Sequence, residues 1–290
     1  MIDATLYSDP ACPWAYSESP ALRVIEWRYG EQLRWRLVLV GLTEDASQYE
    51  QRGYTPLRGA LGQLRFRGRY GMPFAPVPKP RLSATSPACR AIVAARMAEP
   101  GSEWHVYRAL QLANFTSPLV LEDEAQLADA LRTVPGVDAN EVVARIDAPD
   151  VVEAYERDRL ETRGAQGSAA ELQGKTATTD GPVRFTAPSV AFEANGQRLV
   201  AGGFQPVEAY DVLIANLDPT LQRQPSPETP EPLLERFEDG LTTQEVAALL
   251  ADGNDAPDRV GAEAALIELA GAGKAVRQPL GDDAVWKRTS

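Results

Sequence analysis

Histidine and cysteine are scarce in this chain of 290 residues, which contains one histidine, His105, and two cysteines, Cys12 and Cys89. Metal sites built from several histidines or from a cysteine cluster are therefore excluded, and we expect no metal site. A Ser-His-Asp or Cys-His arrangement would have to use His105, which lies in a segment with the pattern of an ordinary amphipathic helix. We interpret His105 as a structural or surface residue.

Long apolar runs and a leader pattern are also missing. No stretch is apolar enough to span a membrane, and the first residues carry Asp3 without the basic and apolar regions of a secretory signal. We therefore expect a cytoplasmic protein that does not bind membranes. With 44% hydrophobic and 24% charged residues, the composition is that of a chain that buries a core.

Basic residues are outnumbered, with 29 Lys and Arg against 41 Asp and Glu and a net charge of -12, which argues against general nucleic-acid binding. The charge is uneven, because no Asp or Glu occurs between Gln51 and Ala98. The basic residues of this segment are Arg52, Arg58, Arg65, Arg67, Arg69, Lys79, Arg81, Arg90 and Arg96. Either the segment attracts an anionic substrate, or its charges are solvated and paired with acidic neighbours elsewhere.

The first forty residues have the pattern of a strand, a helix and a second strand. Ala4 to Tyr7 is β-like, Ala15 to Tyr29 has helical spacing before Gly30, and Arg34 to Val40 ends in a β-rich run. Alternation of this kind is typical of a βαβ unit in an α/β protein.

A mainly helical pattern then extends over about residues 56–164, and we predict a helical insertion there. Ser86 is a candidate N-cap with Pro87 at the first helical position. Two further helices are predicted over Leu119 to Leu131 and over Asp138 to Ala148. A β-hairpin with an Asn195-Gly196 turn follows, and after it a helix from Pro206 to Leu217.

Residues 218–232 contain five of the chain's prolines and have the composition of a semi-rigid linker, so we predict a domain boundary there. In residues 233–290, Thr242 and Glu245 have capping-box spacing, a helix is predicted from Arg259 to about Ala270, and the tail alternates around a turn. This order suggests a small winged-helix-like domain. Because it has eleven acidic and six basic residues, we expect docking or dimerisation, including a homodimer, rather than DNA binding.

Cys12 lies between a predicted strand and a predicted helix, with Pro13 at the first helical position and Trp14 after it. A thiol at a helix N-terminus faces unpaired N–H groups and the positive end of the helix dipole. Both favour the thiolate, so the sequence predicts a reactive Cys12 with a lowered pKa.

This Cys-Pro-Trp sequence, the helical insertion and the later Thr186-Ala187-Pro188 resemble the DsbA family of thioredoxin-fold proteins over residues 1 to about 217. The chain is most similar to the cytoplasmic branch, which shares its layout with the 2-hydroxychromene-2-carboxylate isomerases and the kappa-class glutathione transferases. The resemblance implies a thioredoxin fold with a helical insertion, with Cys12 as the catalytic thiol. It further implies that Pro188 is a cis-proline facing Cys12, and that the backbone of Ala187 before it pairs with substrate. We also expect Pro13 and Trp14 to contact substrate, with the edge of a core as the equally suitable alternative for Trp14.

The chain departs from the family pattern at Ala15, where disulfide oxidoreductases of this kind have a second cysteine. Cys12 alone forms a mixed disulfide but cannot pass on an intramolecular disulfide. Cys89, in the first turn of another predicted helix, is a candidate resolving thiol, with a small core residue as the alternative.

Three functions stay open on this sequence. The first is a thiol–disulfide oxidoreductase that works through the single thiol of Cys12 on a small thiol or disulfide substrate, including an anionic one. The second is a transferase or isomerase that depends on a thiol cofactor, and the third is a non-enzymatic binding or regulatory protein. We expect no tightly bound cofactor, only a low-molecular-weight thiol.

Overall fold

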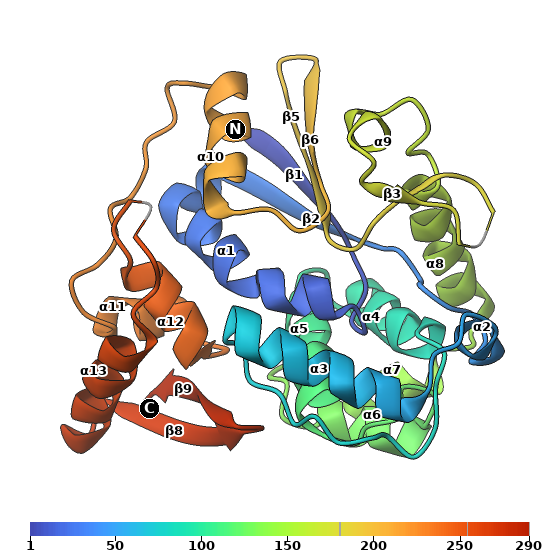
Figure 1. Cartoon of the computed structure of the whole chain (residues 1–290), viewed down its shortest axis with the longest axis horizontal. Helices are drawn as coiled ribbons and strands as arrows, with labels where there is room; N and C mark the ends of the chain where they lie inside the picture. Colours follow the sequence, from blue (N-terminus) through green and yellow to red (C-terminus); the bar gives the residue numbers. More distant parts are fainter. Residues whose placement is uncertain (180, 254, 290) are drawn as a thin grey trace.

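A four-stranded mixed sheet lies at the centre of the fold in the computed structural model, which describes residues 1–179, 181–253 and 255–289 (Figure 1). The strand order is β2-β1-β5-β6, with β1 parallel to β2 and antiparallel to β5, and with β5 and β6 forming a hairpin. The bounds of these strands are Ile2–Ser8 for β1, Leu33–Leu39 for β2, Ser189–Ala194 for β5 and Gln197–Gly202 for β6.

Both faces of this sheet are covered, as β1 demonstrates. Its alternate residues point to opposite faces, because side chains alternate along a strand. Leu6 packs into the main hydrophobic core on one face of the sheet. Tyr7 packs with Val38, Ala191 and Cys12 on the other face. This second face carries the candidate site.

The local predictions around the sheet agree with the structure. Helix α1 spans Pro13–Tyr29 and begins two residues before the predicted Ala15, since Pro13 occupies its first position. It ends at Gly30, which has a φ of 51°. At the predicted hairpin turn, Asn195 and Gly196 both have positive φ, as a tight two-residue turn requires.

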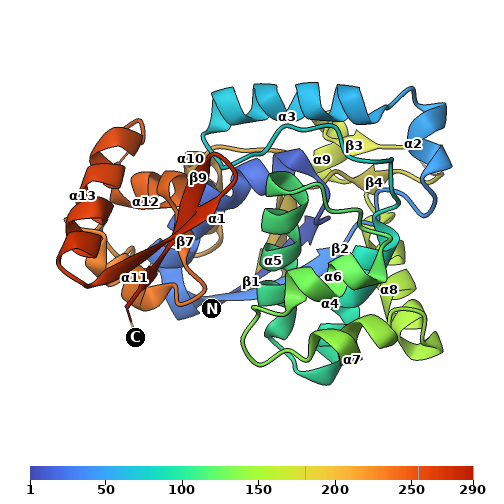
Figure 2. The same ribbon diagram turned by 90° about the horizontal axis from the view of Figure 1, so that it is seen from below.

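The segment between β2 and β5 is mainly helical, as predicted. Its helices are α2 (Ser47–Gln51), α3 (Pro56–Tyr70), α4 (Ser86–Ala98), α5 (Ser102–Thr116), α6 (Glu124–Leu131), α7 (Ala139–Ala144), α8 (Pro149–Thr162) and α9 (Ala169–Leu172), followed by the two-residue strands β3 (Thr176–Ala177) and β4 (Arg184–Phe185). Figure 2 shows α3 lying across one side of the molecule, apart from the packed helices α4 to α7.

Four predicted helix boundaries in this segment were wrong. Ser86 is the first residue of α4 and Thr85 occupies the cap position. The helix predicted from Leu119 begins only at Glu124, because the Asp123 carboxylate caps it there. Asp138 likewise caps α7 from outside, and that helix ends at Ala144 rather than at Ala148.

After α10 (Val207–Leu217), an extended proline-rich stretch leads to a second group of elements. These are α11 (Glu231–Arg236), β7 (Leu241–Thr242), α12 (Thr243–Leu250), α13 (Arg259–Gly271), β8 (Ala275–Leu280) and β9 (Asp283–Arg288), and their sheet has the order β7-β9-β8. The predicted capping box of Thr242 and Glu245 is present. Helix α11 was not predicted. The winged-helix identity and the domain boundaries stay predictions, and residues 254 and 290 of the predicted domain lie outside the described residues.

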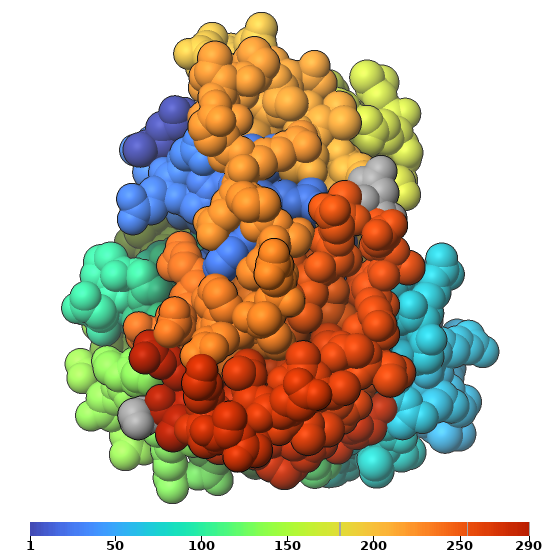
Figure 3. Space-filling view, turned by 90° about the vertical axis from the view of Figure 1, so that its left-hand side faces the viewer, coloured from blue at the N-terminus to red at the C-terminus, as the bar shows by residue number. Residues whose placement is uncertain are grey.

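The C-terminal elements pack onto α1 of the same chain. Their hydrophobic cluster, which includes Trp286, also contains Val24 and Trp27 of α1. Buried charges join these elements to α5 as well, since Arg108 of α5 donates to both carboxylate oxygens of Glu245 at 2.7 and 2.8 Å. Figure 3 shows this side of the molecule, largely covered by the orange and red C-terminal residues. The predicted homodimer stays a prediction.

The described residues contain neither a helix that could cross a membrane nor a cluster that could hold a metal ion. None of the helices described is both long enough and apolar enough to cross a membrane. Within the same residues, no group of three or more His, Cys, Asp and Glu side chains is placed to hold a metal ion.

Candidate active site

Cys12 occupies the N-cap position of α1, directly after the turn that leaves β1. Its backbone N–H donates to the Asp9 carbonyl at 3.1 Å, which closes this turn. The side chain is 5% exposed, and its Sγ donates to the carbonyl oxygen of Ala187 at 2.9 Å. The thiol therefore faces the segment between β4 and β5, 175 residues away in the sequence.

The peptide bond that joins Ala187 to Pro188 is cis. Side chains on both sides of this bond hold the segment in place: the Thr186 hydroxyl donates to the Lys175 carbonyl at 3.0 Å, and the Ser189 hydroxyl donates to the Thr186 carbonyl at 2.8 Å. The structure thus brings together Cys12, Ala187 and Pro188, three of the residues singled out from the sequence. Pro13 is half-buried beside them as the first residue of α1.

The pKa of Cys12 is raised, whereas the sequence predicted a lowered pKa. The backbone N–H groups of Ala15 and Trp14 lower it, as the helix N-terminus predicts, but burial of the thiol is the larger effect and raises the pKa to about 12. In this closed arrangement Cys12 is a neutral thiol, and the hydrogen bond to the Ala187 carbonyl uses its proton. The prediction of a lowered pKa was wrong for this state of the site.

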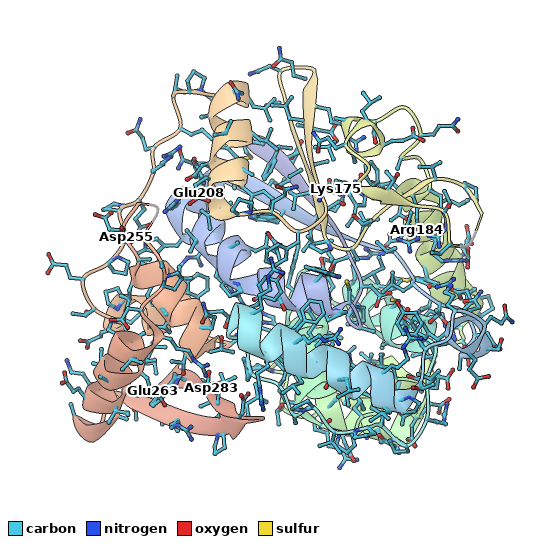
Figure 4. The ribbon with its side chains drawn as sticks, in the orientation of Figure 1. Lys175, Arg184, Glu208, Asp255, Glu263 and Asp283 are labelled. Atoms are coloured by element: carbon cyan, nitrogen blue, oxygen red, sulfur yellow. The ribbon has the colours of Figure 1, made fainter. Side chains whose placement is uncertain are left out.

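Arg184 contributes a favourable charge to the same site. Its guanidinium lowers the pKa of Cys12, although less than burial raises it. The side chain is buried and donates to the Phe185 carbonyl at 3.0 Å and to the Thr179 hydroxyl at 3.0 Å. Figure 4 shows Arg184 on the side of the molecule formed by β3 and α8. A thiolate on Cys12 would therefore have one positive neighbour.

Cys89 lies in the first turn of α4 and is completely buried, and both cysteines are free. Its Sγ donates to Oδ2 of Asp9 at 3.6 Å. Burial, and after it the Asp9 charge, raises the pKa of the Cys89 thiol well above its usual value. Cys89 belongs to the main hydrophobic core, which favours the small-core-residue interpretation. The resolving role stays a prediction.

Asp9 was not predicted from the sequence and interacts with both thiols. Its Oδ1 accepts from the Ala11 N–H at 2.8 Å, and its Oδ2 accepts from the Leu42 N–H and the Thr85 hydroxyl, both at 2.8 Å. Burial raises the pKa of Asp9, and its charge raises the pKa of Cys12. The available signal was an Asp three residues before Cys12 in a turn that follows a strand.

An aromatic group forms one wall of the site. Trp14 is 44% exposed, and its ring centroid lies 4.8 Å from Phe66 and 5.9 Å from Tyr70, both on α3. Phe204, after β6, completes the group at 5.8 Å from Trp14. Trp14 thus links the helix that carries Cys12 to α3 and leaves nearly half of its surface available for a ligand.

The turn between β8 and β9 supports this wall from behind. The Phe74 N–H donates to Oδ1 of Asp282 at 2.8 Å, and the Tyr16 hydroxyl donates to the Pro73 carbonyl at 2.8 Å. A Cβ on Gly281 would lie only 3.0 Å from the Phe74 backbone, so this close approach requires glycine. The C-terminal elements thereby hold the segment that follows α3 against α1.

The basic segment divides into two groups in the structure. Arg81, Arg90 and Arg96 form ion pairs with Glu122, Asp147 and Asp158 respectively, as the paired-charge interpretation predicts. Of the arginines on α3, Arg67 pairs with Asp282 at 3.5 Å, whereas within the described residues Arg58, Arg65 and Arg69 form no ion pair to Asp or Glu.

His105 lies outside the Cys12 site and is exposed, in agreement with its interpretation as a structural or surface residue. It lines a cavity of about 450 Å³ between α1, α5 and the segment after α11, together with Trp104 and Arg23. Cys12 does not line this cavity, and the nearby charges of Arg23 are paired with Glu26 and Asp239.

Comparison with known proteins identifies the fold. No protein-family model matches the chain, and no curated protein matches it in sequence. Among solved structures, the probable DsbA oxidoreductase of Streptomyces coelicolor is 17% identical, with a TM-score of 0.56 over 76% of this chain and 91% of its own. The cytosolic disulfide reductase DsbM of Pseudomonas aeruginosa is 18% identical, with a TM-score of 0.51 over 74% of this chain and 98% of its own.

These similarities show that most of the chain has a DsbA-like thioredoxin fold, as predicted. Both neighbours are matched over nearly their whole lengths, while about a quarter of this chain lies outside each match.

Proposed function

We propose that the protein is a thiol–disulfide oxidoreductase that works through the single thiol of Cys12. The observation that carries this proposal is the position of the Cys12 Sγ, at the N-terminus of the first helix and 2.9 Å from the carbonyl of the cis Ala187–Pro188 peptide. A free thiol facing an irregular, well-anchored backbone segment suits exchange with a disulfide held along that segment. The family resemblance and the fold of the solved neighbours point to the same chemistry.

In the proposed reaction, the Cys12 sulfur attacks one sulfur of a substrate R–S–S–R′. A Cys12–S–S–R bond forms, the substrate disulfide breaks, and R′ leaves as a thiolate that takes up the proton released by Cys12. A low-molecular-weight thiol then attacks the mixed disulfide, forms a new disulfide with R, and returns Cys12 to the thiol. A second molecule of the small thiol then attacks this new disulfide, which releases R as a thiol and leaves the disulfide of the small thiol. Both halves of the substrate are thereby reduced, and the two small thiols supply the two electrons.

The chain's own groups would act on the proton and on the orientation of the sulfur. Attack requires the thiolate, so the bond from Cys12 to the Ala187 carbonyl must break as the substrate enters. The N–H groups of Trp14 and Ala15 and the guanidinium of Arg184 then stabilise the negative sulfur. Ala187 and Pro188 would lie beside the substrate backbone, and Pro13 and Trp14 would flank its side chains.

Glutathione is the small thiol to test first, because one solved neighbour is described as the cytosolic disulfide reductase DsbM with GSH. A cycle that depends on a small thiol needs a reducing compartment, so we place the protein in the cytoplasm. Cys89 is a second source of the resolving thiol, which would require the Asp9 turn to open.

The test is reduction of a peptide disulfide by glutathione, coupled to glutathione reductase. We expect Cys12→Ser to lower the enzymatic rate to that of buffer alone and Cys89→Ala to keep most of it. Retained turnover in Cys12→Ser would refute the covalent role and favour a cofactor-dependent transferase or isomerase instead. Loss in Cys89→Ala with the fold intact would assign the resolving step to Cys89.

A further inference from the structure

The outer face of α3 carries an exposed apolar stripe. Leu57, Leu61 and Leu64 follow one another at intervals of four and three residues, which places them on one side of the helix. They are 59%, 50% and 45% exposed. Single exposed leucines are ordinary, but three in a row on a helix that also contacts the candidate site mark a surface suited to a partner.

Arginines flank this stripe. Arg58, Arg65 and Arg69 are exposed, and among the described residues they have no ion pair with Asp or Glu. Arg96 on α4 and Arg81 in the preceding loop both have such a partner, and on α3 itself Arg67 pairs with Asp282, so Arg58, Arg65 and Arg69 form the unpaired basic group of this helix. Because no acidic residue occurs between Gln51 and Ala98, the chain offers no local counter-charge. The face is complementary to an acidic ligand with apolar side chains.

The same helix reaches the candidate site. Phe66 and Tyr70, on its C-terminal half, pack against Trp14, two residues from Cys12. At 1.5 Å per residue the 15 residues of α3 are about 22 Å long, the length of roughly six or seven residues of extended chain. The leucines lie on the opposite side of α3 from Phe66 and Tyr70, so a polypeptide with one sulfur at Cys12 must pass over the helix to reach the leucine stripe. A small disulfide with one sulfur at Cys12 is too short to extend along α3.

We propose that the outer face of α3 binds an acidic segment with apolar side chains in a protein substrate, and so presents the disulfide of that segment to Cys12. This inference rests on the proposed function, and it names proteins rather than small disulfides as the substrate class. The leucine stripe would contact the apolar side chains, and Arg58, Arg65 and Arg69 would pair with flanking carboxylates.

A second copy of this chain is the competing occupant. Helix α13 exposes Val260 and Ile267 with Glu263 and Glu268 nearby, and Figure 4 labels Glu263 on this helix. The contact of α3 with the aromatic wall favours the substrate, because self-association through α13 would not need a position beside Cys12. The oligomeric state of the protein distinguishes a second copy of this chain from a protein substrate on this face.

The binding test uses a labelled acidic peptide with apolar residues and one cysteine, offered to the Cys12→Ser protein so that no exchange takes place. The triple variant Arg58→Glu, Arg65→Glu, Arg69→Glu should weaken binding about tenfold, as expected for three exposed charge pairs. The matched control reverses three exposed arginines elsewhere, Arg132, Arg157 and Arg288, with the same change in net charge. It should bind as tightly as the parent.

The remaining outcomes decide the proposal. Equal binding by the two triple variants, or equal affinity for a basic peptide of the same length, would overturn it. So would a concentration-dependent dimer, seen by light scattering, that only the α3 variant dissociates. Reduction of a small non-peptide disulfide, bis(2-hydroxyethyl) disulfide, by glutathione in the presence of the unmodified protein tests the proposed function alone. Absence of that activity with peptide binding intact would refute the chemistry and keep the docking surface.

Discussion

The two cysteines occupy similar places in the secondary structure and very different surroundings. Both lie at the N-terminal end of a helix with a proline close by, and both are buried. The proton of Cys12 is donated to the backbone carbonyl of Ala187, whereas that of Cys89 is donated to the buried carboxylate of Asp9. A helix N-terminus alone therefore does not make a thiol reactive. The acceptor group that faces the sulfur determines the role of the thiol.

The largest expected effect is that loss of the Cys89 thiol lowers mainly the stability of the protein, whereas loss of the Cys12 thiol abolishes its activity. Cys89→Ala should cost about 1–2 kcal/mol of unfolding free energy, because it opens a small cavity in the main core and removes a donor to Asp9. Cys12→Ala should cost less, because that thiol lies at the edge of the core, and yet should abolish exchange. Denaturant unfolding and peptide-disulfide reduction measured on both variants test this. Equal stability of the two variants would contradict it.

A smaller effect is expected when the missing cysteine is restored. Ala15→Cys creates the C-x-x-C spacing in the first turn of α1, so Cys12 and the new thiol should form an intramolecular disulfide and shorten the life of the mixed disulfide. Thiol counting and mass spectrometry of trapped intermediates measure both. Transfer of the mixed disulfide to Cys89 in this variant would contradict the contrast between a reactive Cys12 and a structural Cys89.

The smallest effect concerns the C-terminal support of the aromatic wall. Asp282→Ala removes the acceptor for the Phe74 N–H and should cost about 1 kcal/mol. Hydrogen exchange should rise in α3 and residues 71–74, with β1 and β5 unchanged. Glu235→Ala, an exposed acidic residue on α11, serves as the control. Equal exchange in α3 for both variants would show that the turn does not hold this helix.

Features determined by neighbouring residues were predictable from the sequence. The start of α1 at Pro13, the Asn195-Gly196 turn and the Thr242 capping box each depend on a few adjacent side chains. The helical insertion could be predicted for the same reason, although the Asp123 and Asp138 caps shortened two of its helices.

Features that depend on packing could not be predicted. The raised pKa of Cys12 results mainly from burial by segments far away in the sequence, and the local N–H groups pointed to the opposite direction. Asp9 was missed because its partners Leu42 and Thr85 come from other parts of the chain. The division of the basic segment into paired and unpaired arginines likewise required the positions of their acidic partners.

The most direct test of the central claim is the alkylation rate of the two thiols in the folded, reduced protein, followed by mass spectrometry as the pH is raised. We predict that Cys12 is modified before Cys89 at every pH. Its rate should keep rising beyond the pKa of an ordinary thiol, about 8.5, because burial raises its own pKa to about 12. Modification of Cys89 first, with Cys12 protected, would contradict the assignment of Cys12 as the reactive thiol.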